Sequence, residues 1–198
     1  MRVSTQTTHQ GRRASYLQVR RLPIALLAGL AFCAAGLTLR ASAPEQPSLE
    51  YRVKAAFLMN FAKFVEWPPA VFSSDQTPLS LCTLGADVFG TTLEQMVAGE
   101  TANGRRFVVQ KLDRPPAPGS CQVLFVNLPE KDRSRVLAAL GPDVLTVGEG
   151  VGFLRDGGMI ALVIDNRRVR FDINQTAAEH AGLKMSSQLL KVARVVRK

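Results

Sequence analysis

Apolar and polar positions recur along the chain with periods that predict both helices and strands. The first periodic segment runs from Tyr51 to Trp67, where apolar residues return every three or four positions, as on one face of a helix. The proline pair at 68 and 69 predicts the end of this helix, because the residue before a proline avoids helical backbone angles. We expect the stripe to pack in the core; it comprises Val53, Phe57, Phe61 and Phe64.

Two further expectations concern the end of this helix. Lys63 and Glu66 lie three positions apart and are expected to pair on its outer face. Trp67 stands next to the two prolines, and we expect it at a rim of the fold with its ring half exposed.

Continuous apolar runs bounded by turn residues predict buried strands. The densest run, residues 122–127, directly follows Cys121 and contains four consecutive large apolar side chains. A helix is expected from Glu130 to Leu140, because Gly141-Pro142 is a stop signal. The other predicted strands cover residues 79–84, 106–112 and 144–147.

The last part of the chain predicts a β-hairpin followed by two helical segments. An apolar run at 159–164, a turn at Asp165-Asn166 and an alternating segment at 168–173 predict two antiparallel strands with one wet face. That face would carry Arg168, Arg170 and Asp172. The helical segments are expected at 175–181 and from Ser186, as N-cap, to Val196.

This order of elements predicts an α/β fold. We expect a single three-layer domain over residues 44–198, with a mixed, mostly parallel sheet flanked by helices and with a C-terminal β-hairpin and helices. A segment of this length is enough for one domain with a sizeable core.

Residues 1–43 have the pattern of a cleaved export signal. Six arginines and no acidic residue surround an apolar run from Leu22 to Leu39, and Ala41-Ser42-Ala43 supplies a cleavage site of small residues. The mature protein would then begin near Pro44. The alternative is a retained membrane anchor, since the apolar run approaches the length of a bilayer-spanning helix.

Removing this segment changes the charge of the chain. The full sequence has 25 basic and 16 acidic side chains, a net charge of +9. Without the six arginines of residues 1–43, 19 basic side chains remain against the same 16 acidic ones, a net charge of +3. The remainder contains no long basic run or aromatic ladder, so no nucleic-acid partner is expected.

Cysteine usage predicts a disulfide. Cys33 leaves with the signal, and Cys82 and Cys121 remain as an even pair in an oxidising compartment. A reactive or metal-binding pair is the alternative, but it needs further ligands, and His180 is the only histidine after residue 43.

Catalytic motifs are absent from the sequence, so we expect no enzyme, no metal and no cofactor. There is no Gly-x-Ser-x-Gly, no Gly-x-Gly-x-x-Gly and no phosphate-binding Gly-Lys-Ser/Thr. Asp156, Asp165 and Asp172 could converge in space, although aspartates suit solvated turns and edges. His180 is expected on an exposed helix, where it could report acidic pH near a partner.

Several ordered blocks resemble the YfiR-like family of periplasmic proteins, and together they cover nearly all of the chain after the signal. The longest is residues 53–68, with the sequence VKAAFLMNFAKFVEWP. The later blocks are residues 145–148, Phe153, 157–160, 169–174 and 181–190.

The resemblance implies a regulator that binds the periplasmic sensing domain of an inner-membrane diguanylate cyclase and holds it inactive. It also implies an outer-membrane lipoprotein that sequesters the regulator, a homodimer, and a stabilising disulfide at Cys82 and Cys121. The chain departs from the family's named member because it lacks a second cysteine pair, which puts redox switching through an additional bridge in doubt.

A periplasmic small-ligand sensor acting on another membrane receptor is the alternative function, with its pocket at 85–90 or around Arg168 and Arg170. An exported enzyme of unknown chemistry ranks below both. An exposed apolar patch would favour the regulator, and an enclosed pocket with converging polar groups would favour the sensor. The candidate contact residues for a partner or ligand are Asn60, Lys63, Trp67, Arg168, Arg170 and Asp172.

Overall fold

The computed structural model describes residues 47–198, which lie in one compact unit, Glu45–Lys198. The predicted export signal lies outside the described residues. The helices are α1 (Leu49–Lys63), η2 (Pro69–Val71), α2 (Thr92–Val97), α3 (Glu130–Ala139), α4 (Gly152–Arg155), α5 (Gln175–His180) and α6 (Ser187–Val192). The strands are β1 (Val65–Glu66), β2 (Leu79–Gly85), β3 (Thr101–Ala102), β4 (Arg105–Leu112), β5 (Val123–Asn127), β6 (Leu145–Glu149), β7 (Ile160–Asp165), β8 (Arg168–Asn174), β9 (Lys184–Met185) and β10 (Val195–Arg197).

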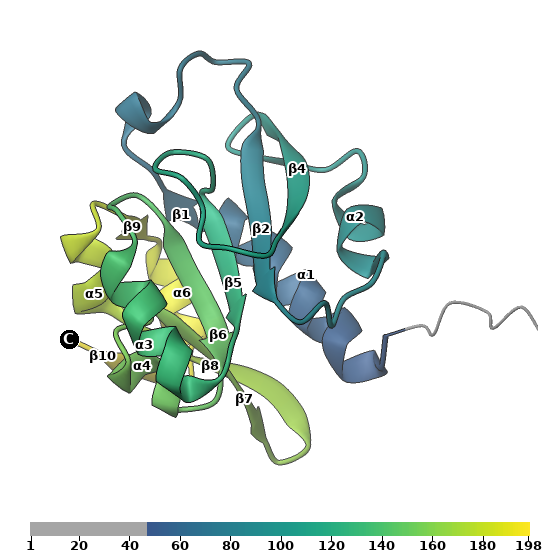
Figure 1. Cartoon of the computed structure of the whole chain (residues 1–198), viewed down its shortest axis with the longest axis vertical. Coiled ribbons are helices and arrows are strands. Elements are labelled where there is room, and N and C mark those ends of the chain that lie inside the picture. The colour runs from purple at the N-terminus through teal and green to yellow at the C-terminus, as the bar shows by residue number, and fades with distance from the viewer. Residues whose placement is uncertain (1–46) are drawn as a thin grey trace, which may run out of the picture. The chain divides into compact units, whose positions relative to one another are not determined.

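One sheet of eight strands organises the domain, in the order β10-β8-β7-β6-β5-β2-β4-β3 (Figure 1). Its five central strands, β7, β6, β5, β2 and β4, are parallel. β8 runs antiparallel to β7, β10 runs parallel to β8, and β3 runs antiparallel to β4. The predicted α/β class with a mixed, mostly parallel sheet is confirmed.

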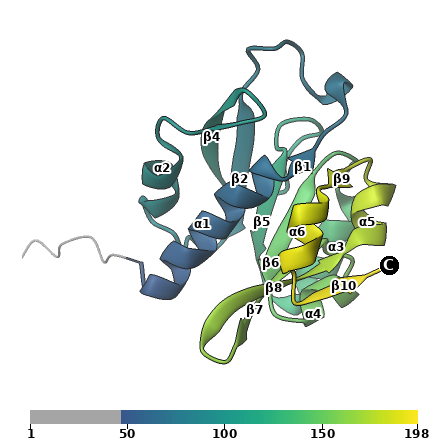
Figure 2. The ribbon, with the colours of Figure 1, turned by 180° about the vertical axis from the view of Figure 1, so that it is seen from behind.

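Helices on both faces of the sheet create two hydrophobic cores. Neighbouring residues of a strand point to opposite faces, and in β5 Phe125 packs with α1 while Leu124 packs on the other face. α3 and α4 lie on the near side in Figure 1, whereas α1, α5 and α6 lie on the near side in Figure 2. This arrangement gives the predicted three layers, and it explains why the central strands read as unbroken apolar runs.

The first helix ends earlier than the proline pair predicts. α1 stops at Lys63, and Val65–Glu66 form strand β1, which pairs with β9. The predicted pair between Lys63 and Glu66 is therefore wrong, because the ammonium of Lys63 binds Glu100 at 2.7 Å. The stripe is only partly core: Phe61 is buried, but Val53 and Phe64 are each 37% exposed.

The C-terminal segment also differs from the prediction. Ser186 caps α6 as expected, since its hydroxyl accepts a hydrogen bond from the Leu189 N–H at 3.2 Å. The helix ends at Val192, and Val195–Arg197 form the edge strand β10 instead of another helical turn.

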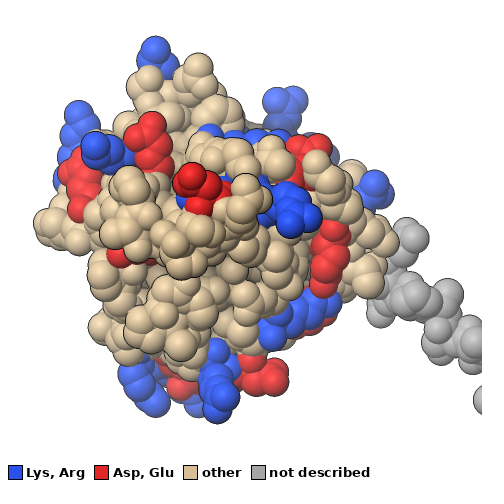
Figure 3. All heavy atoms as spheres, turned by 90° about the horizontal axis from the view of Figure 1, so that it is seen from above, with Lys and Arg blue, Asp and Glu red and all other residues tan. Residues whose placement is uncertain are grey.

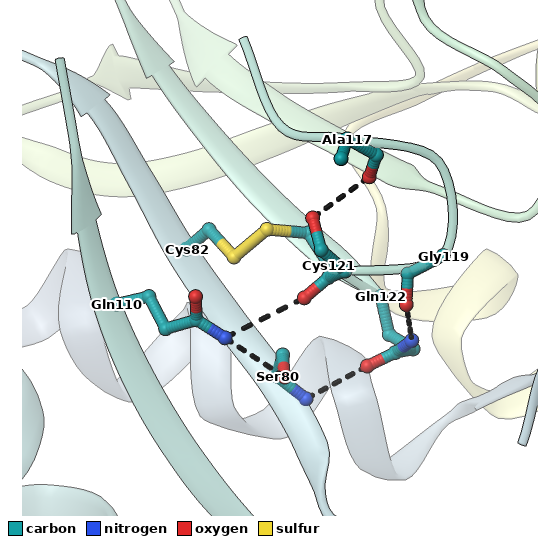
Figure 4. Close-up of a disulfide and its surroundings, with 8 residues drawn as sticks. Ser80, Cys82, Gln110, Ala117, Gly119, Cys121 and Gln122 are labelled. Atoms are coloured by element: carbon teal, nitrogen blue, oxygen red, sulfur yellow. Dashed lines mark hydrogen bonds between the residues drawn. A yellow bond between two sulfur atoms is a disulfide. The ribbon is translucent and has the colours of Figure 1, made fainter. Parts of the chain in front are cut away.

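The predicted disulfide is confirmed (Figure 4). Cys82 of β2 bonds to Cys121, two residues before β5, with 6.1 Å between their Cα atoms. Both cysteines are buried on the α3 and α4 side of the sheet. Nearby, the Gln122 side chain accepts a hydrogen bond from the Ser80 N–H at 2.8 Å, so the bridge and this contact both join β2 to the start of β5.

A buried phenylalanine explains two glycines on this same side. Phe153 of α4 is fully buried between Gly148 and Gly158. A Cβ atom at Gly148 would lie 2.3 Å from the ring of Phe153, and one at Gly158 would lie 2.1 Å from it. Both positions therefore exclude a side chain.

Candidate functional site

Exposed large apolar side chains concentrate around α1. Residues 47–198 contain eight such side chains, and five of them lie on α1 or beside it, which makes this surface the candidate for an interaction site. Leu49 is 73% exposed, Val192 61% and Ile164 54%. The other two are Val53 and Phe64, the members of the predicted core stripe that the fold leaves partly uncovered.

A groove runs alongside α1. A hollow of about 590 Å³ separates the first half of the helix from the β7–β8 hairpin, and a hollow of about 380 Å³ separates its second half from α6. Phe57 lines both hollows, so they adjoin. We call this surface the α1 groove; it is lined by Val53, Phe57 and Asn60 of α1, Phe64 directly after this helix, Ile164, Arg167, Arg168 and Val169 of the hairpin, Phe171 of β8, and Leu189 and Val192 of α6.

Three aromatic rings form the floor of the α1 groove. The ring of Phe171 lies 4.9 Å from that of Phe61 and 5.4 Å from that of Phe57, and the Phe57 and Phe61 rings are 5.7 Å apart. These spacings are typical of favourable aromatic pairs. The floor is therefore packed by contacts between side chains of this chain itself.

A buried ion pair holds α1 against the sheet. Lys54 is 2% exposed, and its ammonium lies 2.5 Å from Glu50 and 2.9 Å from Glu149 at the end of β6. It also lies 4.5 Å from the ring centre of Tyr51. Burial lowers the pKa of Lys54, but hydrogen bonds to the two glutamates outweigh this effect and raise the pKa above its ordinary value.

Sequence reasoning missed Lys54 as a site residue. The one available signal was its position among apolar residues. Lys54 lies one residue after Val53 and three before Phe57, next to the apolar stripe of α1. A lysine is almost never fully buried unless it is paired. Its partner Glu149 ties α1 to the end of β6 and so positions one wall of the groove, whereas Glu50 pairs with it within the helix.

Two of the six predicted contact residues lie in the α1 groove. Asn60 lines the hollow next to α6, and Arg168 lines the hollow next to the hairpin. Arg170 is exposed, but it lines neither of the two hollows.

The remaining three predicted contacts have structural partners. Lys63 binds Glu100. Trp67 is only 8% exposed, so the expected half-exposed rim position is wrong; its indole N–H donates to the Asp143 carbonyl at 2.9 Å. Asp172 is 3% exposed and not on a wet face, because it accepts two hydrogen bonds from the guanidinium of Arg194.

The glycine turn after β2 is already filled. The carboxylate of Asp87 accepts hydrogen bonds from the Phe89 and Gly90 N–H groups at 3.1 and 2.9 Å, and Lys111 binds it at 2.8 Å. Burial raises the pKa of Asp87, but the hydrogen bond from Lys111 and those two backbone bonds lower it below its ordinary value. The amides that would hold a phosphate or an anionic ligand therefore bind Asp87.

The candidate carboxylates do not converge. Asp156 pairs with Arg133, and Asp172 pairs with Arg194. Within residues 47–198, no cluster of three or more His, Cys, Asp or Glu side chains is placed to hold a metal ion. His180 is exposed on α5, as predicted.

The surface charges are mixed. On the face shown in Figure 3, basic and acidic side chains are interspersed with uncharged surface.

Across residues 47–198, none of the helices has both the length and the apolar character needed to cross a membrane.

Comparison with known proteins decides the family. The family model described as YfiR/HmsC-like matches residues 51–194. The chain belongs to the YfiR/HmsC-like family. Members of this family are non-enzymatic periplasmic regulators of cyclic di-GMP signalling that act on a membrane receptor.

Two solved structures show more distant similarity to this YfiR/HmsC-like chain. One is an ABC domain from Streptococcus pneumoniae in complex with L-Trp, with 12% identity and a TM-score of 0.44, covering 72% of this chain. The other is a conserved domain protein from Vibrio cholerae, with 11% identity and a TM-score of 0.47, covering 74% of this chain. The chain spans 60% of the length of each.

Proposed function

We propose that this protein binds and inhibits the periplasmic sensing domain of an inner-membrane diguanylate cyclase, and so lowers cyclic di-GMP output. The observation that carries the proposal is the α1 groove, an uncovered apolar surface on a member of a family that regulates this signal. A second copy of the chain and an outer-membrane lipoprotein are the other proposed partners. The lipoprotein would sequester the regulator and relieve inhibition.

Inhibition of this kind needs no catalytic group in the regulator. A cyclase that exchanges between active and inactive conformations shifts towards the inactive one if the regulator binds that conformation more tightly. A shift from mostly active to mostly inactive needs a preference of about 10⁴-fold, or less if the active conformation is only slightly favoured. The regulator therefore requires surface complementarity, which a preformed groove with a packed aromatic floor supplies.

The test is cellular cyclic di-GMP in a deletion strain, its parent and a complemented strain. We expect a rise on deletion that complementation reverses and that a second deletion, of the target cyclase, abolishes. An unchanged level in every growth condition would contradict the proposal.

A small-ligand sensor is the second candidate, and one observation favours it. A hollow of about 560 Å³ lies beyond the C-terminal end of α1. Trp67, Phe72, Arg105 and Lys184 are among the residues that line it, and they offer an aromatic and basic environment. However, Arg105 already donates to the carbonyls of Ser74, Asp75 and Thr77, and its guanidinium stacks on Phe72 at 3.8 Å. The hollow is thus less open to an anion than its composition implies, and we rank this function second.

A further inference from the structure

The side of α1 that lines the groove has the spacing of a helix-packing seam. Val53, Phe57, Asn60 and Phe64 follow one another at intervals of four, three and four residues. This spacing places side chains along one line that faces a partner helix, as at the a and d positions of a coiled coil. Its two ends lie 11 positions apart, about 17 Å at the rise of an α-helix, and Phe64 directly follows the last helical residue.

Asn60 interrupts this otherwise apolar seam. It is partly exposed, and it lines the hollow between α1 and α6. A single asparagine in such a seam fixes register and partner choice, because an apolar side chain opposite it would leave the amide without a hydrogen bond. The seam therefore selects a partner with a polar side chain at the middle of its contact.

The hairpin end of the groove is basic. In the described part of the chain, the arginines that form ion pairs are Arg105, Arg133, Arg135 and Arg194. Arg167 and Arg168 are not among them, although both are exposed and line the hollow. Glu50 also lines it but is bound to Lys54, and Asp165 lies opposite Arg168 in the β7–β8 register without an ion pair between them.

An added β-strand does not fit this surface. β7 pairs with β8 from Arg168 to Ile173, whereas β10 pairs with it only at Asp172–Asn174. A strand added at the remaining edge, residues 168–171, would extend the sheet sideways and would not lie on the face over Phe171 that floors the groove. A partner in this groove must bring its own internal hydrogen bonds, which a helix does. Helix packing at about 8–10 Å between axes also suits a groove walled by α1 and α6.

We propose that the α1 groove receives one amphipathic helix from the partner's periplasmic domain, with an apolar face on the seam, a polar side chain against Asn60 and a carboxylate beside Arg167 and Arg168. This inference rests on the proposed function, because it takes the cyclase as the partner. It adds the chemistry of the docking segment, a helix of about 12–15 residues with an acidic end.

Site-specific photocrosslinking in cells tests the occupant. The full chain carries benzoylphenylalanine either at position 164, in the groove, or at position 151, at the start of α4 on the other face of the sheet. The two native residues are matched, since Ile164 is 54% exposed and Val151 is 51% exposed. Mass spectrometry identifies the crosslinked peptide.

We expect an adduct from position 164 alone, mapped to a helical, acidic and amphipathic segment of a cyclase's periplasmic domain. An adduct with a second copy of the chain, with a non-helical segment, or only from position 151 would overturn the proposal. The absence of any adduct at position 164 would do so as well. If deletion raises cyclic di-GMP while the groove gives no cyclase adduct, the proposed function stands and the inference fails.

Charge reversal tests the acidic end separately. We compare the affinity of the purified protein for the cyclase's isolated periplasmic domain between wild type, Arg167→Glu/Arg168→Glu and the exposed loop control Arg114→Glu. We expect the double variant to bind at least about tenfold more weakly, and added salt to weaken wild type more than the double variant. Equal affinities for the three proteins would overturn the charged part of the proposal, whereas no binding by wild type would contradict the proposed function itself.

Discussion

Removal of the Cys82–Cys121 disulfide should lower the free energy of unfolding by about 4 kcal/mol. The bridge joins residues 39 apart, and closing a loop of that length restricts the unfolded chain by about this amount in the chain-entropy model. For a domain of this size, such a loss corresponds to a fall in Tm of roughly 8–16 °C. The suitable variant is Cys82→Ala/Cys121→Ala, because a serine at either buried position would need a hydrogen-bond partner.

Urea and thermal unfolding of this variant, the oxidised wild type and the fully reduced wild type provide the assay. The variant and the reduced wild type should unfold alike and well below the oxidised protein. Reduction of the folded protein should be slow without denaturant, since both cysteines are at most 1% exposed. A fall in Tm of less than about 3 °C for the variant would refute the reasoning.

Three further predictions concern the packing and charges that hold the groove and the sheet. Gly158→Ala should lower the free energy of unfolding by about 2 kcal/mol or more, because its Cβ would overlap the ring of Phe153. Adding Phe153→Leu to this variant should recover part of the loss. An unchanged urea unfolding curve for Gly158→Ala would contradict the clash. Asp172→Asn should lower Tm by about 3–8 °C, because it removes the ion pair with Arg194. The variant should still repress cyclic di-GMP at low temperature. Loss of repression with an unchanged Tm would instead show that Asp172 contacts the partner. Lys54→Met should destabilise the protein at neutral pH, and its difference from wild type in the free energy of unfolding should shrink as pH rises above about 10.5. The pKa of Lys54 is raised in the folded protein, so the stability that its charge contributes is lost as the pH rises through that folded-state pKa. A difference that stays constant over this alkaline range in urea titrations would contradict the role given to the Lys54 charge.

Sequence patterns predicted the sheet well for a physical reason. Central parallel strands are buried on both faces, so β2 and β5 read as continuous apolar runs whatever their neighbours are. The β7–β8 hairpin was equally readable from its turn and alternation. By contrast, β10 has only three residues and its pairing with β8 is a tertiary contact, which no local period reveals.

The candidate site was harder to predict because periodicity marks an apolar face without saying what covers it. The stripe containing Val53 and Phe64 was assigned to the core, yet the fold leaves these two side chains partly exposed. Both line the groove, which the pattern alone could not reveal. Lys54 and Asp172 were missed or misplaced because their partners, Glu149 and Arg194, lie far away in the sequence. Asn60 and Arg168 were candidate contact residues from the sequence; both line the groove, and their role in contact stays a prediction.

The most direct test of the account adds purified protein to spheroplasts of the deletion strain, in which periplasmic domains face the medium, and measures intracellular cyclic di-GMP. The groove variant Ile164→Asp is compared with its matched control Val151→Asp, both checked for native Tm. We predict that wild type and Val151→Asp lower cyclic di-GMP and that Ile164→Asp does not. No effect of wild type, or equal repression by all three proteins, would contradict the claim that this protein restrains a membrane cyclase through the α1 groove.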